Sequence, residues 1–168
     1  MMIRIRKAEE KDIPEIHAIM QQARRYFAAE NIPQWQGEYP AEIDIVDDLK
    51  QNGGYAAEED GIVVGYCFIQ VMKDPNYDHI EGKWLNEEPY AVMHRTCIHN
   101  EYKGKGIAGM FLEKALQMAE NVRADTHEKN LSMRKMLENH GFQACGTIYV
   151  EDGTPRIGYQ YTKERRPQ

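Results

Sequence analysis

The sequence lacks an excess of positive charge and has no long apolar run. Its 168 residues hold 21 Lys and Arg against 27 Asp and Glu, which gives a formal net charge of −6. Nucleic-acid binders usually need a basic face to displace phosphate counterions, so we expect no nucleic-acid partner. No segment approaches the ~20 consecutive apolar residues of a membrane-spanning helix, and no apolar stretch of signal-peptide length follows the N-terminus. The hypothesis is a cytoplasmic protein with no membrane partner.

Cysteine is also scarce. Cys67, Cys97 and Cys145 are widely separated and none forms a CxxC pair, which argues against both a disulfide framework and a zinc site. We expect all three to be small buried residues. Asp125 and His127 are two candidate metal ligands without a third, so no metal is predicted.

The composition is that of a globular protein, with 42% hydrophobic and 29% charged residues. A chain of this length can bury roughly 70% of the surface that it exposes when unfolded. No repeat or linker interrupts the pattern. The prediction is one domain over residues 1–168.

Helical and strand patterns alternate along the chain. A first helix is predicted where Asp12 provides a cap and Pro14 lies in the first turn. Its apolar stripe, at three- and four-residue steps, packs against a sheet. Strands are predicted over 2–7, 55–57, 62–71, 90–98, 122–125, 142–150 and 155–162, and further helices over 41–51, 107–119 and 130–140.

Two tryptophans lie in predicted loops. Trp35 falls in the loop over 31–39, where it is either a lid over the core or an aromatic wall of a substrate pocket. Trp84 lies in the polar segment 73–89, which is long for a structureless connection, and long loops in compact domains are often functional. We expect these two loops to shape the pocket of the acceptor substrate.

A glycine-rich turn joins the predicted strand over 90–98 to the next helix. It reads Lys103, Gly104, Lys105, Gly106, Ile107 and Ala108. The small residues let the main chain approach a ligand, and the helix start presents free N–H groups and a positive dipole end. A diphosphate is the natural occupant. The spacing is not that of a P-loop and the dinucleotide fingerprint is incomplete, so an ATP site is the weaker alternative.

The glycine turn resembles motif A of the GNAT N-acetyltransferase superfamily, in which a strand leads into Arg/Gln-x-x-Gly-x-Gly/Ala. The matching run is Glu101 to Gly106, with Glu101 departing from the usual first residue. A second signature of the family, an Asn followed by a helix that ends in Gly-Phe, matches Asn130 and the pair Gly141 and Phe142. The two motifs occur in the family's order, and the resemblance covers nearly the whole chain.

The resemblance implies an α/β fold with a mixed, mostly antiparallel central sheet, flanking helices and a splayed central strand pair. It implies acetyl-coenzyme A as the donor and a primary amine, on a small molecule or a peptide, as the acceptor that attacks directly in a ternary complex. The strand ending at Ile98 would pair with the pantetheine arm and donate a main-chain N–H to the carbonyl. The other cofactor residues implied are Lys103, Gly104, Lys105, Gly106, Ile107, Ala108 and Asn130. A homodimer is left open.

The acid and base are assigned on fewer residues. His94 is the candidate base, because imidazoles titrate near neutral pH and some relatives have a histidine at the matching position; the alternative is a hydrogen-bonded core histidine. Many relatives protonate the departing thiolate with a tyrosine where this chain has Leu137. Tyr149, Tyr159 or water is left for that task. The missing tyrosine also supports an alternative function, a noncatalytic acyl-coenzyme A sensor or interaction module.

His127 has two interpretations. It is three residues before Asn130 and beside Asp125, so it either lines the acceptor pocket or caps the following helix. Both stay open at this point.

Overall fold

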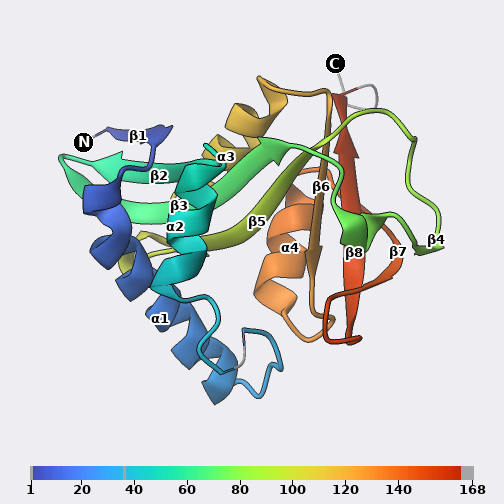
Figure 1. Ribbon diagram of the computed structural model, residues 1–168, viewed down its shortest axis with the longest axis horizontal. Helices are drawn as coiled ribbons and strands as arrows, with labels where there is room; N and C mark the ends of the chain where they lie inside the picture. The colour runs from blue at the N-terminus through green and yellow to red at the C-terminus, as the bar shows by residue number, and fades with distance from the viewer. Residues whose placement is uncertain (1, 36, 164–168) are drawn as a thin grey trace. The chain divides into compact units, whose positions relative to one another are not determined.

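The computed structural model describes residues 2–35 and 37–163 as a mixed α/β fold (Figure 1). The described residues form four α-helices and eight strands. The helices are α1 (Ile13–Ala29), α2 (Glu42–Lys50), α3 (Ile107–Leu116) and α4 (Leu131–Asn139). The strands are β1 (Ile3–Lys7), β2 (Gly54–Glu59), β3 (Ile62–Val71), β4 (Glu81–Gly82), β5 (Ala91–Ile98), β6 (Asn121–Thr126), β7 (Gln143–Tyr149) and β8 (Pro155–Thr162).

The strands follow one another in the order β1-β2-β3-β5-β6-β8-β7-β4. The pairs β1/β2, β2/β3, β6/β8, β7/β8 and β4/β7 are antiparallel, whereas β5 and β6 are parallel. The parallel register consists of Ala91 with Val122 and Val92 with Arg123, at the start of both strands. The predicted fold class, a mostly antiparallel sheet with flanking helices, is confirmed.

Contacts divide the chain into two compact units. The first unit comprises Met1–Ile69 and His94–Lys114, and the second comprises Gln70–Met93 and Ala115–Gln168. Strands β3 and β5 contribute residues to both units. The single domain over 1–168 stays a prediction, and each unit is described by itself.

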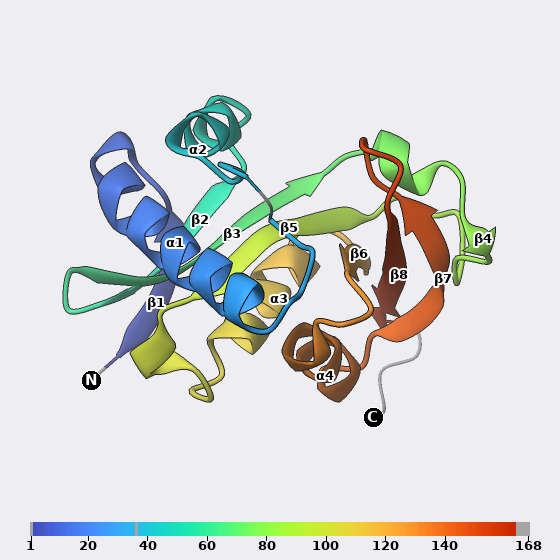
Figure 2. The same ribbon diagram turned by 90° about the horizontal axis from the view of Figure 1, so that it is seen from below.

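The core of the first unit lies between its strands and the helices α1 and α2, which cover one face of the strands (Figures 1 and 2). The predicted stripe of α1 forms this core with residues from both β2 and β3. Its fully buried members include Ile16, Met20, Ile45, Ala56 and Tyr66. Helix α3 starts on the other face, because a Cβ on Gly65, the neighbour of Tyr66, would lie 3.3 Å from Ile107 Cγ2.

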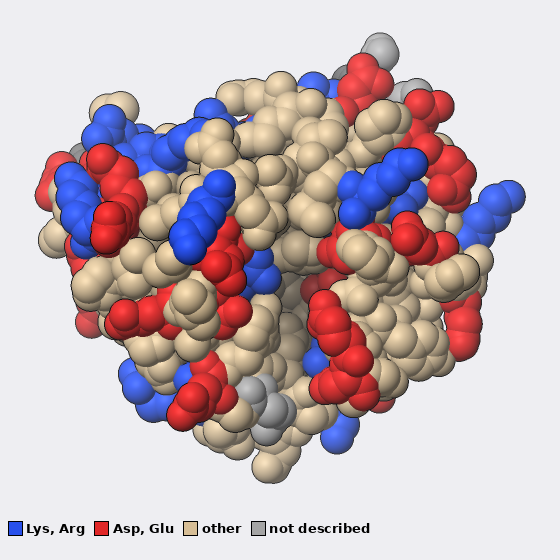
Figure 3. Space-filling model, in the orientation of Figure 1, with Lys and Arg blue, Asp and Glu red and all other residues tan. Residues whose placement is uncertain are grey.

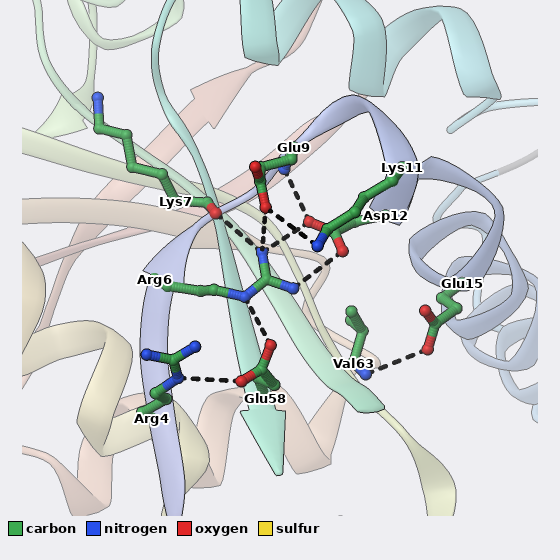
Figure 4. A network of polar contacts seen from close by, with 9 residues as sticks. All are labelled: Arg4, Arg6, Lys7, Glu9, Lys11, Asp12, Glu15, Glu58 and Val63. Carbon is green, nitrogen blue, oxygen red and sulfur yellow. Dashed lines mark hydrogen bonds and ion pairs between the residues drawn. The ribbon is translucent and has the colours of Figure 1, made fainter. Parts of the chain in front are cut away.

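Asp12 is the N-cap residue of α1, as predicted, but its carboxylate makes no capping hydrogen bond to the helix, and this part of the prediction was wrong. Asp12 is 3% exposed and accepts two hydrogen bonds from the Arg6 guanidinium, at 2.7 and 2.9 Å, and one from the Glu9 N–H at 2.7 Å (Figure 4). Arg6 also donates to Glu58 on β2. The carboxylate joins β1 to the start of α1 because an arginine fork offers a stronger, two-pronged partner than a helix N–H.

In the second unit the two faces of β8 carry different partners, since neighbouring side chains of a strand alternate. Tyr159 on one face donates to Glu138 of α4 at 2.9 Å. On the other face Gly158 leaves room for Trp84, whose ring would lie 2.8 Å from a Cβ at that position. The segment 72–90 and α4 therefore pack on opposite faces.

Strand β4 was not predicted. Its Gly82 pairs with Gly146 of β7, and a Cβ on Gly82 would come 2.2 Å from the Cys145 carbonyl oxygen. The two glycines allow the backbones of β4 and β7 to come close together, and no periodic sequence pattern predicts this pairing.

The cysteines only partly match their prediction. Cys67 and Cys97 are buried, and burial raises the pKa of the Cys67 thiol to about 12. Cys145 is partly exposed, so its predicted burial was wrong. It sits at the irregular register of β7, where the strand departs from regular pairing.

The charges of the surface are mixed in sign. On the face drawn in Figure 3, Lys and Arg side chains lie interspersed with Asp and Glu. Across residues 2–35 and 37–163, no helix has the length and apolar character needed to cross a membrane.

We predict that Asp12 makes folding sensitive to acid. Burial alone would raise the pKa of Asp12, but the hydrogen bonds from Arg6 and Glu9 outweigh it and hold the pKa below its usual value. The stabilisation is therefore present above the unfolded pKa of about 4 and is lost as the pH falls through the folded value. Asp12→Asn should lower the free energy of unfolding by roughly 3 kcal/mol at pH 7.

Urea unfolding of both proteins between pH 3 and pH 7 measures this difference. The gap between wild type and Asp12→Asn should shrink on acidification, whereas Asp47→Asn, at an exposed position of α2, should give a small gap throughout. A gap for Asp12→Asn that stays constant with pH would show that the carboxylate is not held ionised by Arg6.

Candidate active site

The glycine turn lies in the first unit, directly before α3. A 3-10 turn over Asn100–Tyr102 precedes it, and Gly104 and Gly106 adopt φ angles of +79° and +82°. Residues other than glycine rarely adopt these φ angles. A Cβ added at either glycine would meet no atom within 4 Å, so the main chain borders open space. The two glycines therefore place no side chain of their own in this space, next to the N–H groups at the start of α3.

Two lysines flank these glycines. Lys103 and Lys105 are exposed, and their ammonium groups lie over the rings of Tyr26 and Tyr102, at 5.0 and 4.7 Å from the ring centroids. Ile107 is buried in the core, so its contribution to a ligand is its main-chain N–H. The predicted cofactor residues over 103–108 thus form the turn and the start of α3, while their role toward a cofactor stays a prediction.

The candidate base His94 is half-buried on β5. Its ring stacks on Phe68 of β3, with centroids 6.4 Å apart and an interplanar angle of 10°. Ile98 ends the same strand with a half-buried side chain. His94 and Ile98 thus come from one strand of the first unit, as the sequence predicted, while their chemical roles stay predictions.

A buried ion pair that the sequence did not reveal lies beside His94. Asp48 of α2 is 2% exposed and accepts from the next residue of β5, Arg95, at 2.9 Å from Nε and 2.5 Å from a terminal nitrogen. The Tyr66 hydroxyl donates to the same carboxylate at 2.6 Å. The Arg95 guanidinium also donates to the Tyr39 hydroxyl at 3.0 Å.

The charges of this cluster reinforce one another. Burial alone would lower the pKa of Arg95, but its hydrogen bonds to Asp48 raise the pKa above the ordinary value. Burial and the neighbouring Asp48 carboxylate both raise the pKa of Tyr66, so this phenol stays protonated and donates. Arg95 adopts a φ of +55°, which is uncommon for a residue other than glycine. No sequence pattern marks such a residue.

Trp35 belongs to the first unit and packs on its core. Its ring meets Phe27 edge to face, with centroids 5.5 Å apart, and it is half-buried against the core cluster. This geometry supports the lid interpretation. The role of Trp35 as a wall for substrate stays a prediction.

Asn130 and His127 belong to the second unit. Asn130 is 2% exposed and its Oδ1 accepts from the Met133 N–H at 3.2 Å, which caps α4. His127 is 8% exposed, and its Nδ1 accepts from the Lys129 N–H at 3.1 Å. Burial, followed by the charge of Arg156, lowers the pKa of His127. Both side chains accept hydrogen bonds from main-chain N–H groups just before or at the start of α4. Their roles toward cofactor and acceptor stay predictions.

The candidate acids other than water are poor proton donors. A hydrogen bond to Glu81 raises the pKa of the exposed Tyr149, and burial raises that of Tyr159. Leu137, which stands where many relatives have tyrosine, is 1% exposed and lies in the core. Neither tyrosine is tuned to release a proton near neutral pH.

The second unit also contains an open cavity of about 930 Å³. Trp84, Tyr90 and Arg123 are among the residues that line it, and the Arg123 guanidinium lies 4.1 and 4.2 Å from the centroids of the two rings. Trp84 is therefore both a core residue and a cavity wall. Among residues 2–35 and 37–163 no three His, Cys, Asp or Glu side chains are grouped as metal ligands, and the absence of a metal stays a prediction.

Comparisons with known proteins agree with this arrangement. The profile of the Acetyltransferase (GNAT) family matches residues 16–142. A solved structure of a GNAT family acetyltransferase from Streptococcus agalactiae 2603 is 35% identical, with a TM-score of 0.88, and the match covers 97% of this chain and 96% of that one. No curated protein sequence matches the chain.

More distant structures share the fold. Ard1 from Thermoplasma volcanium is 15% identical, with a TM-score of 0.68 over 96% of this chain and 98% of that chain. A structure of the NatC complex bound to Gag peptide and CoA contains a chain 14% identical, with a TM-score of 0.66 over 96% and 99% of the two chains. The family match and the streptococcal structure together show that this chain belongs to the acetyltransferase (GNAT) family.

Proposed function

We propose that the chain transfers an acetyl group from acetyl-coenzyme A to a primary amine, on a small molecule or a peptide, by direct attack in a ternary complex. Membership of the acetyltransferase (GNAT) family supports the reaction class. A structure with the same fold, the NatC complex, was solved with CoA and a peptide bound. Both support the donor and the kind of acceptor.

The observation that carries the proposal is the open turn before α3. Gly104 and Gly106 hold left-handed φ angles beside open space, and the N–H groups that follow have the helix dipole behind them. Lys103 and Lys105 add positive charge in a protein of net charge −6. These features suit the diphosphate of coenzyme A, whose charge would otherwise be repelled by the acidic protein.

The chemistry needs a base and an oxyanion partner. The acceptor ammonium must lose one proton before its nitrogen can attack the thioester carbonyl carbon, and His94 is the residue that we assign to take it. The main-chain N–H of Ile98 would donate to the carbonyl oxygen as negative charge develops there. After the attack the nitrogen gives its second proton to water, His94 passes its own proton to solvent, and the C–S bond breaks. The departing thiolate then takes a proton, so that the products are the acetylated amine, free coenzyme A and one proton.

Water is the proposed source of that last proton. Leu137 has no proton to give, and the pKa values of Tyr149 and Tyr159 are raised. A thiol has a pKa of about 8.5, so its thiolate is a moderate base that water can protonate. The reaction therefore does not require a tyrosine at the position of Leu137.

The alternative function is a noncatalytic sensor of acyl-coenzyme A, and Leu137 is the observation that favours it. We predict that the protein releases free thiol from acetyl-coenzyme A in an amine-dependent way, with saturation in the amine. The measurement is thiol release with a panel of small amines, amino acids and peptides. Saturable binding of coenzyme A without thiol release for any member of the panel would favour the sensor.

We predict that Gly106→Glu abolishes binding of coenzyme A. A glutamate would introduce a side chain at a φ of +82° and a negative charge where we place the phosphates. Calorimetry with coenzyme A measures the effect. Gly153→Glu is the matched control, because Gly153 has the same φ of +82° and no atom within 4 Å of an added Cβ, in the turn between β7 and β8.

The control variant should bind coenzyme A with the affinity of the wild type, since its backbone strain is the same but its position is not. Unchanged affinity in Gly106→Glu would remove the turn from the site. Parallel titration with ATP should give much weaker binding, because the turn has no P-loop lysine and hydroxyl pair.

We predict that His94→Ala lowers turnover by about 10²-fold or more, the usual contribution of a general base. The affinity for coenzyme A should change much less, because His94 is not part of the turn. The dependence of kcat on pH should also change, because the residue that we assign to accept the proton is removed. Steady-state kinetics across pH measures both effects, with His140→Ala, at the end of α4, as a control for loss of a histidine. A rate and pH profile equal to those of the wild type would make His94 structural.

A further inference from the structure

The main chain at Arg95 departs from the regular geometry of β5. Its φ of +55° lies in the left-handed region, where side chains other than glycine are uncommon. In a regular strand consecutive side chains point to opposite faces. Here His94 stacks on the Phe68 ring, and the next residue, Arg95, places its guanidinium carbon 5.1 Å from the centroid of the same ring. The unusual backbone brings both side chains to one aromatic surface.

A conformation of this kind persists only when the surroundings enforce it. The restraint on Arg95 is the carboxylate of Asp48, which accepts two hydrogen bonds from the guanidinium and a third from the Tyr66 hydroxyl. The carboxylate is 2% exposed and comes from α2, so its position is set by the core of the first unit. Because an arginine fork fits a carboxylate in one geometry, the pair fixes the direction of the Arg95 side chain as well as its distance.

The same guanidinium reaches the segment that connects α1 to α2. Its third nitrogen donates to the Tyr39 hydroxyl at 3.0 Å, four residues after Trp35. Arg95 thus contacts α2 through Asp48, the segment before α2 through Tyr39, and β3 through Phe68. Every group in this set belongs to the first unit.

We propose that Arg95 is a positioning residue. Its ion pair with Asp48 holds residue 95 of β5 in the left-handed conformation and so fixes the His94 imidazole against Phe68. The inference rests on the proposed function, in which His94 is the base. Arg95 itself takes and gives no proton. Loss of the ion pair frees the backbone at residue 95 to return to an extended strand, which turns the two side chains to opposite faces and misplaces the imidazole.

A simpler role, stabilisation of the fold alone, makes a different prediction. Breaking any buried ion pair by removing one partner destabilises a protein, so a loss of stability does not separate the two roles. The chain offers a matched control in the ion pair of Arg6 and Asp12, which is also a two-pronged contact with a buried carboxylate in the first unit. Its arginine is on β1 and contacts neither His94 nor Phe68 in the contacts described above.

The experiment compares Asp48→Asn and Arg95→Lys with Asp12→Asn and Arg6→Lys. All four should lower the melting temperature. Asp48→Asn and Arg95→Lys should in addition lower kcat by at least about tenfold, since small misplacements of a reacting group are costly, while the Kd for coenzyme A stays within about twofold because the turn before α3 is intact. Asp12→Asn and Arg6→Lys should keep the kcat of the wild type at a temperature where they are folded. Lysine keeps the positive charge of Arg95 but lacks the two-pronged guanidinium. Arg95→Lys therefore tests the geometry of the contact while a cation still faces the Asp48 carboxylate.

A second readout does not depend on turnover. The ring signals of His94 in an NMR spectrum, assigned by their loss in His94→Asn, should shift in Asp48→Asn and Arg95→Lys and stay in place in Asp12→Asn. If the wild type releases no thiol with any amine, the proposed function fails and these ring signals alone decide the inference. If the ring signals and kcat respond to Asp48→Asn and Asp12→Asn alike, the ion pair is only a stabilising contact and the inference is overturned.

Discussion

The structure at the proposed cofactor site depends on the left-handed main chain at Gly104 and Gly106. An α-helix leaves its first N–H groups without partners inside the helix, and these groups need water, a capping side chain or a ligand. The two glycines turn the chain into α3 with positive φ angles, and a Cβ at either position would border open space. The buried residues of α3, including Ile107 and Phe111, anchor the helix in the core. An anion with several oxygens fits a rigid set of N–H donors of this kind.

Two buried ion pairs join elements of the first unit. Arg6 and Asp12 join β1 to the start of α1, and Arg95 and Asp48 join β5 to α2. A buried ion pair adds little net stability compared with an apolar pair of the same size, because both charges are desolvated. Its value in this chain is geometric, since each fork fixes two elements at one distance and one angle. In the second unit an arginine joins the elements by a different contact, because the Arg123 guanidinium lies against the rings of Trp84 and Tyr90.

Much of the fold could be predicted from the sequence, because hydrophobic periodicity and glycine or proline at the boundaries indicate most of its helices and strands. The stripe of α1 and the turn at Gly104 and Gly106 both follow from rules that act over a few residues. The misses depend on side-chain and backbone contacts that no periodic pattern shows. Asp12 has the spacing of a helix cap but meets Arg6, and β4 forms where Gly82 crosses Gly146. The role of Arg95 was invisible, because neither its φ of +55° nor its partner Asp48, 47 residues away, leaves a local pattern.

We propose that the N–H groups at residues 104–108 bind the diphosphate of coenzyme A, and the structure of a crystal soaked with coenzyme A is the sharpest test of this claim. We expect both phosphates within hydrogen-bonding distance of those N–H groups, at roughly 3 Å from nitrogen to oxygen. Bound coenzyme A with its diphosphate elsewhere, and the start of α3 hydrated, would contradict the claim and the transferase function built on it.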